Sequence, residues 1–249
     1  MTFSVMGFCE RSGAIGIASG TSSIAVGARL GQRVEAGGRE WMVASQAVAR
    51  PGLGFEAGDL LAAGTPMDDL EPLLAAKDPG LAYRQLAVIE RGGDSWVFTG
   101  DKASHWKGHV AGPGFVAFGN ALAGAATVEG MARGFTSDAG ADLAERLVRA
   151  LEEGRDGGGQ ADGEGNHLPE LTAFVRVFQA DADAFVYGDG RSPVLDLRID
   201  YDIDAVTALR RLYERCKPLR EDYELRGRDP QAHLDRASNW EMTLFEEDS

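Results

Sequence analysis

The chain has 249 residues, of which 44% are hydrophobic and 26% charged, and its formal net charge is −14. These proportions are typical of a folded globular protein, and the length allows one large domain with a substantial core. A strongly negative surface repels phosphate backbones and anionic lipids, so we expect neither a nucleic-acid partner nor a membrane partner.

Cysteine use and the start of the chain predict the compartment. Cys9 and Cys216 are the two cysteines, which is too few for a disulfide framework. No apolar run approaches the ~20 residues that span a bilayer, and polar residues follow the start too soon for a signal peptide. We therefore expect a cytoplasmic protein.

The first half of the chain is predicted to be mostly β-structure. Apolar runs bounded by Gly-rich and polar turns predict strands over residues 2–8, 14–19, 41–48, 85–90 and 95–99. The last two form a hairpin around Gly92–Gly93, and Pro51 closes the strand over 41–48. Between them, Thr65–Pro66 predicts a helix start, because a hydroxyl cap and a proline favour the first turn, and Pro79–Gly80 ends this helix.

The second half mixes helices and strands. Helical spacing predicts helices over 121–133 and 138–153, and a third that Asp202 caps and Pro218 ends. Further strands are predicted over residues 114–119, 171–178, 184–187 and 194–199. A Gly-rich loop covers 154–165, and residues 219–249 are polar with weak helical character. Strands at both ends with helices between them favour a layered α+β fold over a regular βαβ alternation.

Several short motifs keep one order along roughly residues 1–200. They are Met1–Val5, Ala25–Arg29, Ala44–Gln46, Arg84–Leu86, Phe98–Gly100, Trp106–His109, Gly119–Gly124 and Asp196–Arg198. Together this ordered set resembles a bacterial family of unknown function that is assigned to the N-terminal-nucleophile (Ntn) hydrolase superfamily. The resemblance implies an α+β fold, a four-layer αββα sandwich over residues 1–200, with residues 201–249 as a C-terminal helical extension. It also implies hydrolysis of a C–N bond.

Thr2 is the candidate nucleophile. An Ntn hydrolase attacks with the side chain of its first residue, and the α-amine of that residue accepts the proton. An α-amine titrates near pH ~8, so a useful fraction is neutral at cytoplasmic pH. Met1 must first be removed, which is expected before a residue as small as Thr2; if Met1 is retained, the mechanism fails. The alternative is that Thr2 only begins a strand, where Thr is common.

Four further residues are candidates for the same site. Asn120 offers an amide N–H for an oxyanion, although Asn is also an excellent helix N-cap. Gln46 matches a family motif and is expected to hold the substrate amide, and His109 to line the pocket or supply a proton. Ser19 follows the second strand, where it would tune the amine. The alternatives are that Gln46 makes a turn hydrogen bond, that His109 is a partly buried structural histidine and that Ser19 begins a turn.

Arg29 and Arg198 could each bind a substrate carboxylate as a bidentate fork, or form a salt bridge with one of the many acids. Two stretches depart from the family pattern. Residues 39–43 replace a Gly-rich strand, and the loop over residues 159–166 lacks the family's cation. If that loop shapes the substrate site, the substrate differs from the family's or the activity is lost.

Other kinds of site are less well supported. Asp101, His105 and His109 have helical spacing for a metal, but Gly108 favours a loop and no HExxH motif is present. Asp200, Asp202 and Asp204 lack the Gly and Glu of a calcium loop. Neither a P-loop nor a GxSxG motif occurs. We expect no metal and no cofactor.

The candidate residues and the resemblance support two hypotheses about function. The first is an N-terminal Thr amidohydrolase that cleaves a C–N bond in a small amide or peptide-like substrate, with Thr2 and Asn120 catalytic and Ser19, Arg29, Gln46 and His109 binding substrate. The alternative is a non-catalytic small-molecule-binding or assembly protein on the same fold, motivated by the missing cation. In either case we expect a homo-oligomer.

Overall fold

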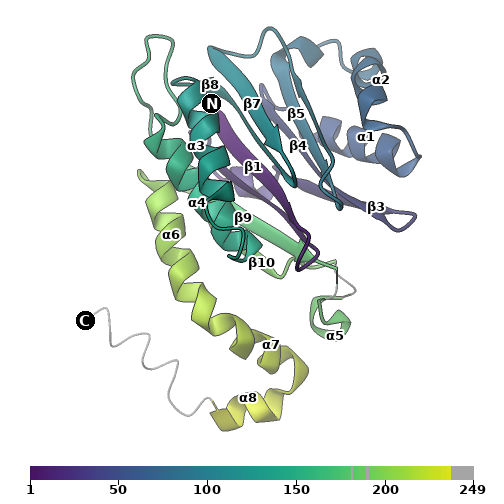
Figure 1. The fold of residues 1–249 in the computed structure, drawn as a ribbon, viewed down its shortest axis with the longest axis vertical. Helices are drawn as coiled ribbons and strands as arrows, with labels where there is room; N and C mark the ends of the chain where they lie inside the picture. The colour runs from purple at the N-terminus through teal and green to yellow at the C-terminus, as the bar shows by residue number, and fades with distance from the viewer. Residues whose placement is uncertain (181, 189–190, 237–249) are drawn as a thin grey trace.

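Two antiparallel sheets form the centre of the computed structural model, which describes residues 1–180, 182–188 and 191–236 (Figure 1). The six-stranded sheet has the order β10-β9-β2-β1-β8-β7, and the four-stranded sheet the order β3-β4-β5-β6. The strands of the larger sheet are β1 (Thr2–Cys9), β2 (Ala14–Thr21), β7 (Trp106–Gly112), β8 (Phe115–Leu122), β9 (Thr172–Gln179) and β10 (Leu195–Ile199). Those of the smaller sheet are β3 (Gln32–Ala36), β4 (Arg39–Ala47), β5 (Arg84–Glu90) and β6 (Ser95–Thr99).

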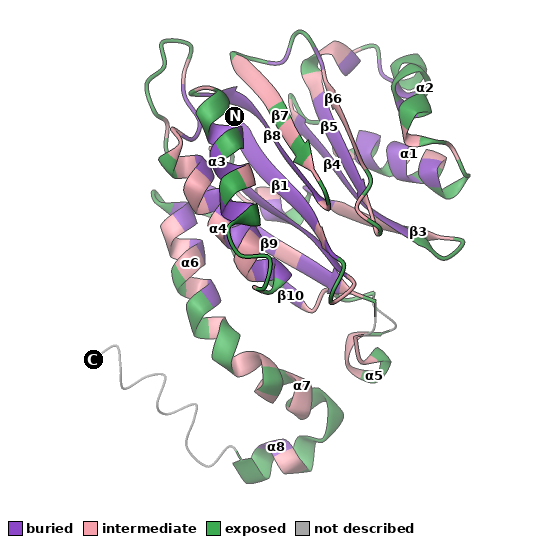
Figure 2. Ribbon diagram, viewed as in Figure 1, coloured by how far each residue is buried: buried purple, intermediate pink, exposed green. Residues whose placement is uncertain are grey.

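Helices cover the outer face of each sheet. Helices α3 (Ala125–Thr136), α4 (Leu143–Asp156) and α6 (Ala205–Cys216) pack on the larger sheet, and α1 (Pro51–Ala62) and α2 (Leu70–Lys77) lie outside the smaller one (Figure 1). The short α5 (Ala184–Tyr187) contacts α7 (Arg220–Arg228), which leads into α8 (Pro230–Arg236). Helices α7 and α8 extend from the end of α6 and are mostly exposed (Figure 2). The protein is therefore an α+β protein with a C-terminal helical region.

Strand alternation divides the core into three layers. On β1, Phe3 and Val5 point to the helices α3 and α4, whereas Met6 points to the smaller sheet. The layer between the sheets holds Met6, Ile17, Met42, Ile89, Phe118 and Phe174, all buried. A third cluster, around Trp41 and Leu61, joins the smaller sheet to α1 and α2. The order from one side to the other is helices, sheet, sheet, helices.

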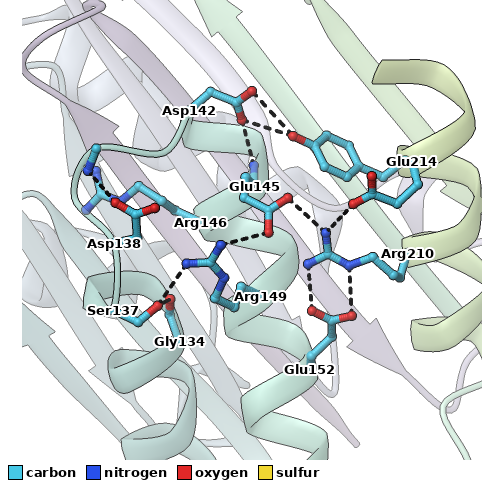
Figure 3. Close-up of polar contacts among 12 residues, drawn as sticks. Gly134, Ser137, Asp138, Asp142, Glu145, Arg146, Arg149, Glu152, Arg210 and Glu214 are labelled. Carbon is cyan, nitrogen blue, oxygen red and sulfur yellow. Dashed lines mark hydrogen bonds and ion pairs between the residues drawn. The ribbon is translucent and has the colours of Figure 1, made fainter. Parts of the chain in front are cut away.

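An ion-pair network ties α6 to α4 (Figure 3). The Arg210 guanidinium donates to both carboxylate oxygens of Glu152 at 2.8 and 2.6 Å and to Glu145 at 2.8 Å. Burial acts to raise the pKa of Glu145, but hydrogen bonds and charge from Arg210 and Arg149 outweigh it and lower the pKa. The network is therefore fully formed near neutral pH and weakens as the pH falls into the range where Glu145 is protonated.

Most predicted strands are confirmed, with bounds within a few residues. The sequence did not predict β3, β7 or α1, and Pro51, expected to close a strand, is the first residue of α1. The predicted strand over 184–187 is wrong: its residues form α5, capped by Asp183, whose carboxylate accepts from the amides of Phe185 and Val186. The prediction of a loop around Gly108 is also wrong, because Gly108 lies inside β7 and pairs with Gly119 of β8.

The predicted helix starts differ most from those in the structure. Thr65 caps no helix; a single 3-10 turn over Met67–Asp69 precedes α2 and has no side-chain cap. Helix α3 begins four residues later than predicted, at Ala125 rather than at residue 121, and α4 begins at Leu143 rather than at residue 138. Asp204, not Asp202, caps α6, since its carboxylate accepts from the Thr207 amide.

Candidate functional site

One end of the layer between the two sheets is polar. At this end, several strands of both sheets carry a hydroxyl or an amide side chain at the positions that face the other sheet. These residues are Thr2, Ser4, Ser19, Thr21, Gln46, Gln85, Asn120 and Thr172, and all are buried. Buried polar groups are costly unless hydrogen-bonded, so their concentration at one end marks a candidate site.

Thr2 lies at the centre of this polar end. It is the first residue of β1, 7% exposed, and its cross-strand partners are Thr21 on β2 and Asn120 on β8. The Thr2 and Thr21 hydroxyl oxygens are 3.0 Å apart. Thr21 donates its single hydroxyl proton to the Met1 carbonyl at 2.8 Å, so Thr2 is the donor between the two hydroxyls. While Met1 is in place, the Thr2 hydroxyl is thus held in one orientation.

The α-amine next to Thr2 is also buried. Burial lowers the pKa of the Met1 α-amine below its ordinary value, because the charged form loses hydration. A lower pKa leaves more of an amine neutral at pH 7 and able to accept a proton. The environment at the start of β1 therefore favours the neutral form of an amine.

A chain of hydrogen bonds links the two sheets behind Thr2. The Ser4 hydroxyl is 2.9 Å from the Ser19 hydroxyl and donates to Gln46 Oε1 at 2.7 Å. Gln46 Nε2 donates to Gln85 Oε1 at 2.8 Å, and Asn120 Nδ2 donates to the same oxygen at 3.2 Å. Gln85 therefore fixes both amides, and one N–H of Asn120 stays outside this bond.

Two cavities flank the start of β1. One, of about 60 Å³, is lined by Thr2, Thr21, Arg29, Ser45 and Gln46 among others. The other, of about 240 Å³, is lined by Met1, Ala47, Val48, Ser104, His105, Asn120 and Ala121. Removal of Met1 would widen the second cavity next to Thr2.

Backbone strain gathers around the second cavity. Ala47, His105 and Ala121 line it and have φ of 72°, 51° and 52°, in the left-handed region that disfavours residues with a Cβ. In the described part of the chain, Ala25 is the one other non-glycine residue with positive φ. Strained residues of this kind cluster at functional sites, where the surrounding structure holds them.

The structure brings together Thr2, Ser19, Gln46 and Asn120, which the sequence had proposed as site residues. It places Arg29, also proposed from the sequence, at the rim of the smaller cavity. Asn120 lies inside β8 and is not a helix N-cap, since Gly124 precedes α3. His109 lies on β7, is exposed and lines neither cavity. Arg198 pairs with Asp200 at 3.4 Å and lines neither cavity.

Ser4, Thr21 and Gln85 belong to the site but were not predicted as site residues. Each occupies an inward-facing position of a strand whose inward-facing residues farther from this end are apolar, such as Met6 on β1, Ile17 on β2 and Ile89 on β5. This break in the alternation is visible in the sequence once the inward face of each strand is known. It is the signal that could have identified them.

The loop over residues 159–166 lies beside the site. Gln160 in this loop is buried, and its Oε1 accepts from the Ser22 amide at 3.0 Å, next to Thr21. Nearby Glu170 is also buried, and burial raises its pKa. The loop is thus anchored by side-chain amide and backbone hydrogen bonds.

A larger cavity lies at the opposite end of β1. It measures about 720 Å³ and is lined by turns around Cys9, Arg11, Asp94 and Gly114 and by Arg146 of α4. Its side chains belong to no network comparable to the one at Thr2, and charges of both signs line it. We therefore place the candidate site at the Thr2 end, where the polar groups converge.

The comparisons with known proteins fit this fold. The model of a family of unknown function, DUF1028, matches residues 2–209. The chain belongs to this family. The crystal structure of protein SPO2555 from Silicibacter pomeroyi, described as a DUF1028 structure, is similar with a TM-score of 0.71 and 29% sequence identity, over 86% of this chain and 88% of that one. No protein with a curated description matches the chain. The DUF1028 match begins at Thr2 and covers every residue of the polar end.

In the described ranges, no three His, Cys, Asp or Glu side chains lie close enough together to hold a metal ion. Of the helices among the described residues, none has the length and apolar character needed to cross a membrane.

Proposed function

We propose that this DUF1028 protein is an N-terminal-nucleophile amidohydrolase with Thr2 as the nucleophile, as expected of the Ntn-hydrolase superfamily. The observation that carries the proposal is the setting of Thr2: a buried side chain at the start of a central strand, with its hydroxyl 3.0 Å from that of Thr21 and lining a cavity. The layer order of helices, sheet, sheet, helices supports a four-layer αββα sandwich.

The reaction begins after removal of Met1. The Thr2 hydroxyl gives its proton to the Thr2 α-amine, and its oxygen forms a bond to the substrate carbonyl carbon. Asn120 Nδ2 donates its second N–H to the oxyanion, while Gln85 holds the amide in place. The C–N bond then breaks, and the departing amine takes the proton from the Thr2 ammonium. Water hydrolyses the resulting ester, releasing the acid and restoring Thr2.

Binding residues complete the proposal. Gln46 and Ser19 lie in the hydrogen-bond chain and support the substrate side of Thr2, and Arg29 lies at the cavity rim. His109 keeps its proposed binding role only for a substrate that reaches the exposed face of β7. We also propose that the protein forms a homo-oligomer. A light-scattering mass equal to that of one chain would contradict this.

The test compares Thr2→Ala with Thr2→Ser across a panel of small amides and short peptides, with amine release as the readout. Ser keeps a hydroxyl and an α-amine, so it should retain measurable turnover, whereas Ala should lose it. Equal folded stability of the two variants, measured by thermal unfolding, makes them a matched pair. Turnover by Thr2→Ala equal to that of the unchanged protein would rule out Thr2 as the nucleophile.

The second candidate is a small-molecule-binding protein without activity. It is favoured by the missing cation in the loop over residues 159–166 and by the engagement of Asn120 with Gln85. Under this proposal the same cavities hold a ligand that is not cleaved. Saturable binding with no amine release, unchanged in Thr2→Ala, would support it over the hydrolase.

A further inference from the structure

The two cavities beside Thr2 contrast with the rest of the molecule in charge. The chain has 39 acidic and 25 basic residues. Yet among the described residues that line these two cavities, none is Asp or Glu, and the ionisable side chains are Arg29 and His105. The other cavities described above and elsewhere on the molecule are lined by side chains of both charges, such as Asp94 and Arg146 at the far end of β1. The Thr2 end is therefore a local site without negative charge on a strongly negative protein.

Among the residues that the structure describes, the Arg29 side chain also has no partner. Its side chain is exposed, and in the described part of the chain no carboxylate lies within ion-pairing distance of its guanidinium. Many other arginines are paired with acids, such as Arg33 with Glu40, Arg84 with Asp78 and Arg210 with Glu152. An unpaired guanidinium keeps its planar set of N–H donors ready for a bidentate acceptor.

The dimensions of the site limit what such an acceptor belongs to. The cavity that Thr2 shares with Arg29 measures about 60 Å³, and the cavity on the Asn120 side about 240 Å³. The smaller space admits a group of a few atoms, and the larger one the remainder of a small molecule. A carboxylate has the size and planar shape that suit the smaller cavity and the Arg29 fork.

We infer that the ligand of this site is a small amide that also carries a carboxylate, and that Arg29 binds this carboxylate. That the ligand is an amide rests on the proposed function. Binding of its carboxylate by Arg29 does not require that the protein hydrolyse it. Arg29 is a binding residue here, and the reacting amide lies between Thr2 and Asn120.

The experiment uses N-acetyl amino acids with a free α-carboxylate and the same compounds as α-carboxamides, with the protein whose N-terminus is Thr2. Calorimetry measures binding, and released amine measures hydrolysis. We expect the acids to be preferred over the carboxamides by about 10–100-fold in Kd and in kcat/KM, the usual range for a charged hydrogen-bonded pair. Arg29→Gln should abolish this preference, and Arg29→Lys should keep part of it through charge alone.

Arg198→Gln is the matched control. Arg198 lies against the same turn, beside Gly27, but pairs with Asp200 and lines neither cavity, so its loss should leave the preference unchanged. Thr2→Ala separates the two proposals: it should abolish hydrolysis while Arg29-dependent binding of the acids remains.

Each remaining outcome decides between them. Thr2-dependent hydrolysis with no preference for the acids, or with a preference that survives Arg29→Gln, overturns the inference and leaves the hydrolase proposal intact. Arg29-dependent binding of the acids without hydrolysis supports the inference and overturns the hydrolase. Absence of both binding and hydrolysis of the acids overturns the inference.

Discussion

The two halves of the layer between the sheets are built on the same strands but differ in chemistry. In one half, Met6, Ile15, Ile17 and Phe118 point inward and pack against the smaller sheet. In the other half, the same strands point Thr2, Ser19, Thr21 and Asn120 inward. Both halves are buried, so the difference lies in side-chain type and not in exposure.

The two halves contribute differently to the stability of the fold. Burying apolar side chains contributes roughly 25 cal/mol per Å² of area removed from water. Burying hydroxyls and amides contributes little net stability even when they are hydrogen-bonded, and costs free energy when they are not. The polar half also holds the strained Ala47 and Ala121. A half that combines weak stabilisation with strain is the half where we place the chemistry.

The largest effect is expected from Asn120, in the polar half. Asn120→Leu keeps the branched shape of the side chain but removes the proposed oxyanion donor, so kcat should fall by about 10²–10³-fold with a smaller change in KM. Steady-state kinetics on any hydrolysed amide measure this. As a control from the apolar half, Ile89→Val should leave kcat near that of the unchanged protein. An equal fall in kcat for both would mean that Asn120 acts only through folding.

The next effect is on stability. Gln85→Met leaves Gln46 Nε2 and Asn120 Nδ2 without their shared acceptor, and the Gly119 carbonyl without its donor at 3.0 Å. We expect a loss of about 2–3 kcal/mol in the free energy of unfolding. Chemical denaturation compares it with Ile89→Val on the same strand, expected to cost about 1 kcal/mol. A smaller loss for Gln85→Met than for Ile89→Val would show that the hydrogen-bond chain is not a stabilising unit.

The burial of the polar half predicts a pH dependence. Burial lowers the pKa of the Met1 α-amine, and an amine on Thr2 at the same strand start should be lowered in the same way. The neutral amine is the base, so kcat/KM should rise about tenfold per pH unit and level off below pH ~8. A pH series with one amide substrate measures this. A rise that continues through pH 8 or beyond would contradict a buried amine base.

The smallest effect concerns strain. Ala47 has φ of 72° and borders both cavities, so Ala47→Gly relieves the strain and should raise the free energy of unfolding by at most about 1 kcal/mol. Ala36→Gly, in the regular strand β3, should lower it by about 0.5–1 kcal/mol. Thermal unfolding of the two variants side by side decides the matter. Equal losses in both would mean that Ala47 is not strained.

The sequence predicted the strands of the centre well because they are buried on both faces and therefore form apolar runs bounded by turns. It did not predict β7 and β3, since both are edge strands with few buried residues, and Gly108 looked like a loop residue. It placed α5 wrongly because Ala184–Tyr187 is short and apolar, and only the carboxylate of Asp183 makes it helical.

The site was predicted in part. Thr2, Gln46 and Asn120 were proposed from motifs and Ser19 from its position after the second strand, and the structure brings them to one end of one layer. Gln85 and Thr21 were not proposed, because their importance comes from partners far apart in sequence: Gln85 reaches Gln46 and Asn120 from a different sheet or strand. Such contacts depend on how the sheets pack, which strand periodicity alone does not determine.

The central claim is that Thr2 carries a free α-amine. The measurement that tests it most directly is the intact mass, with N-terminal sequencing, of the protein purified from its native host. The account predicts a mass lower by one methionine residue and threonine as the first residue. A mass that retains Met1 would contradict the N-terminal-nucleophile mechanism and favour the ligand-binding alternative at the same site.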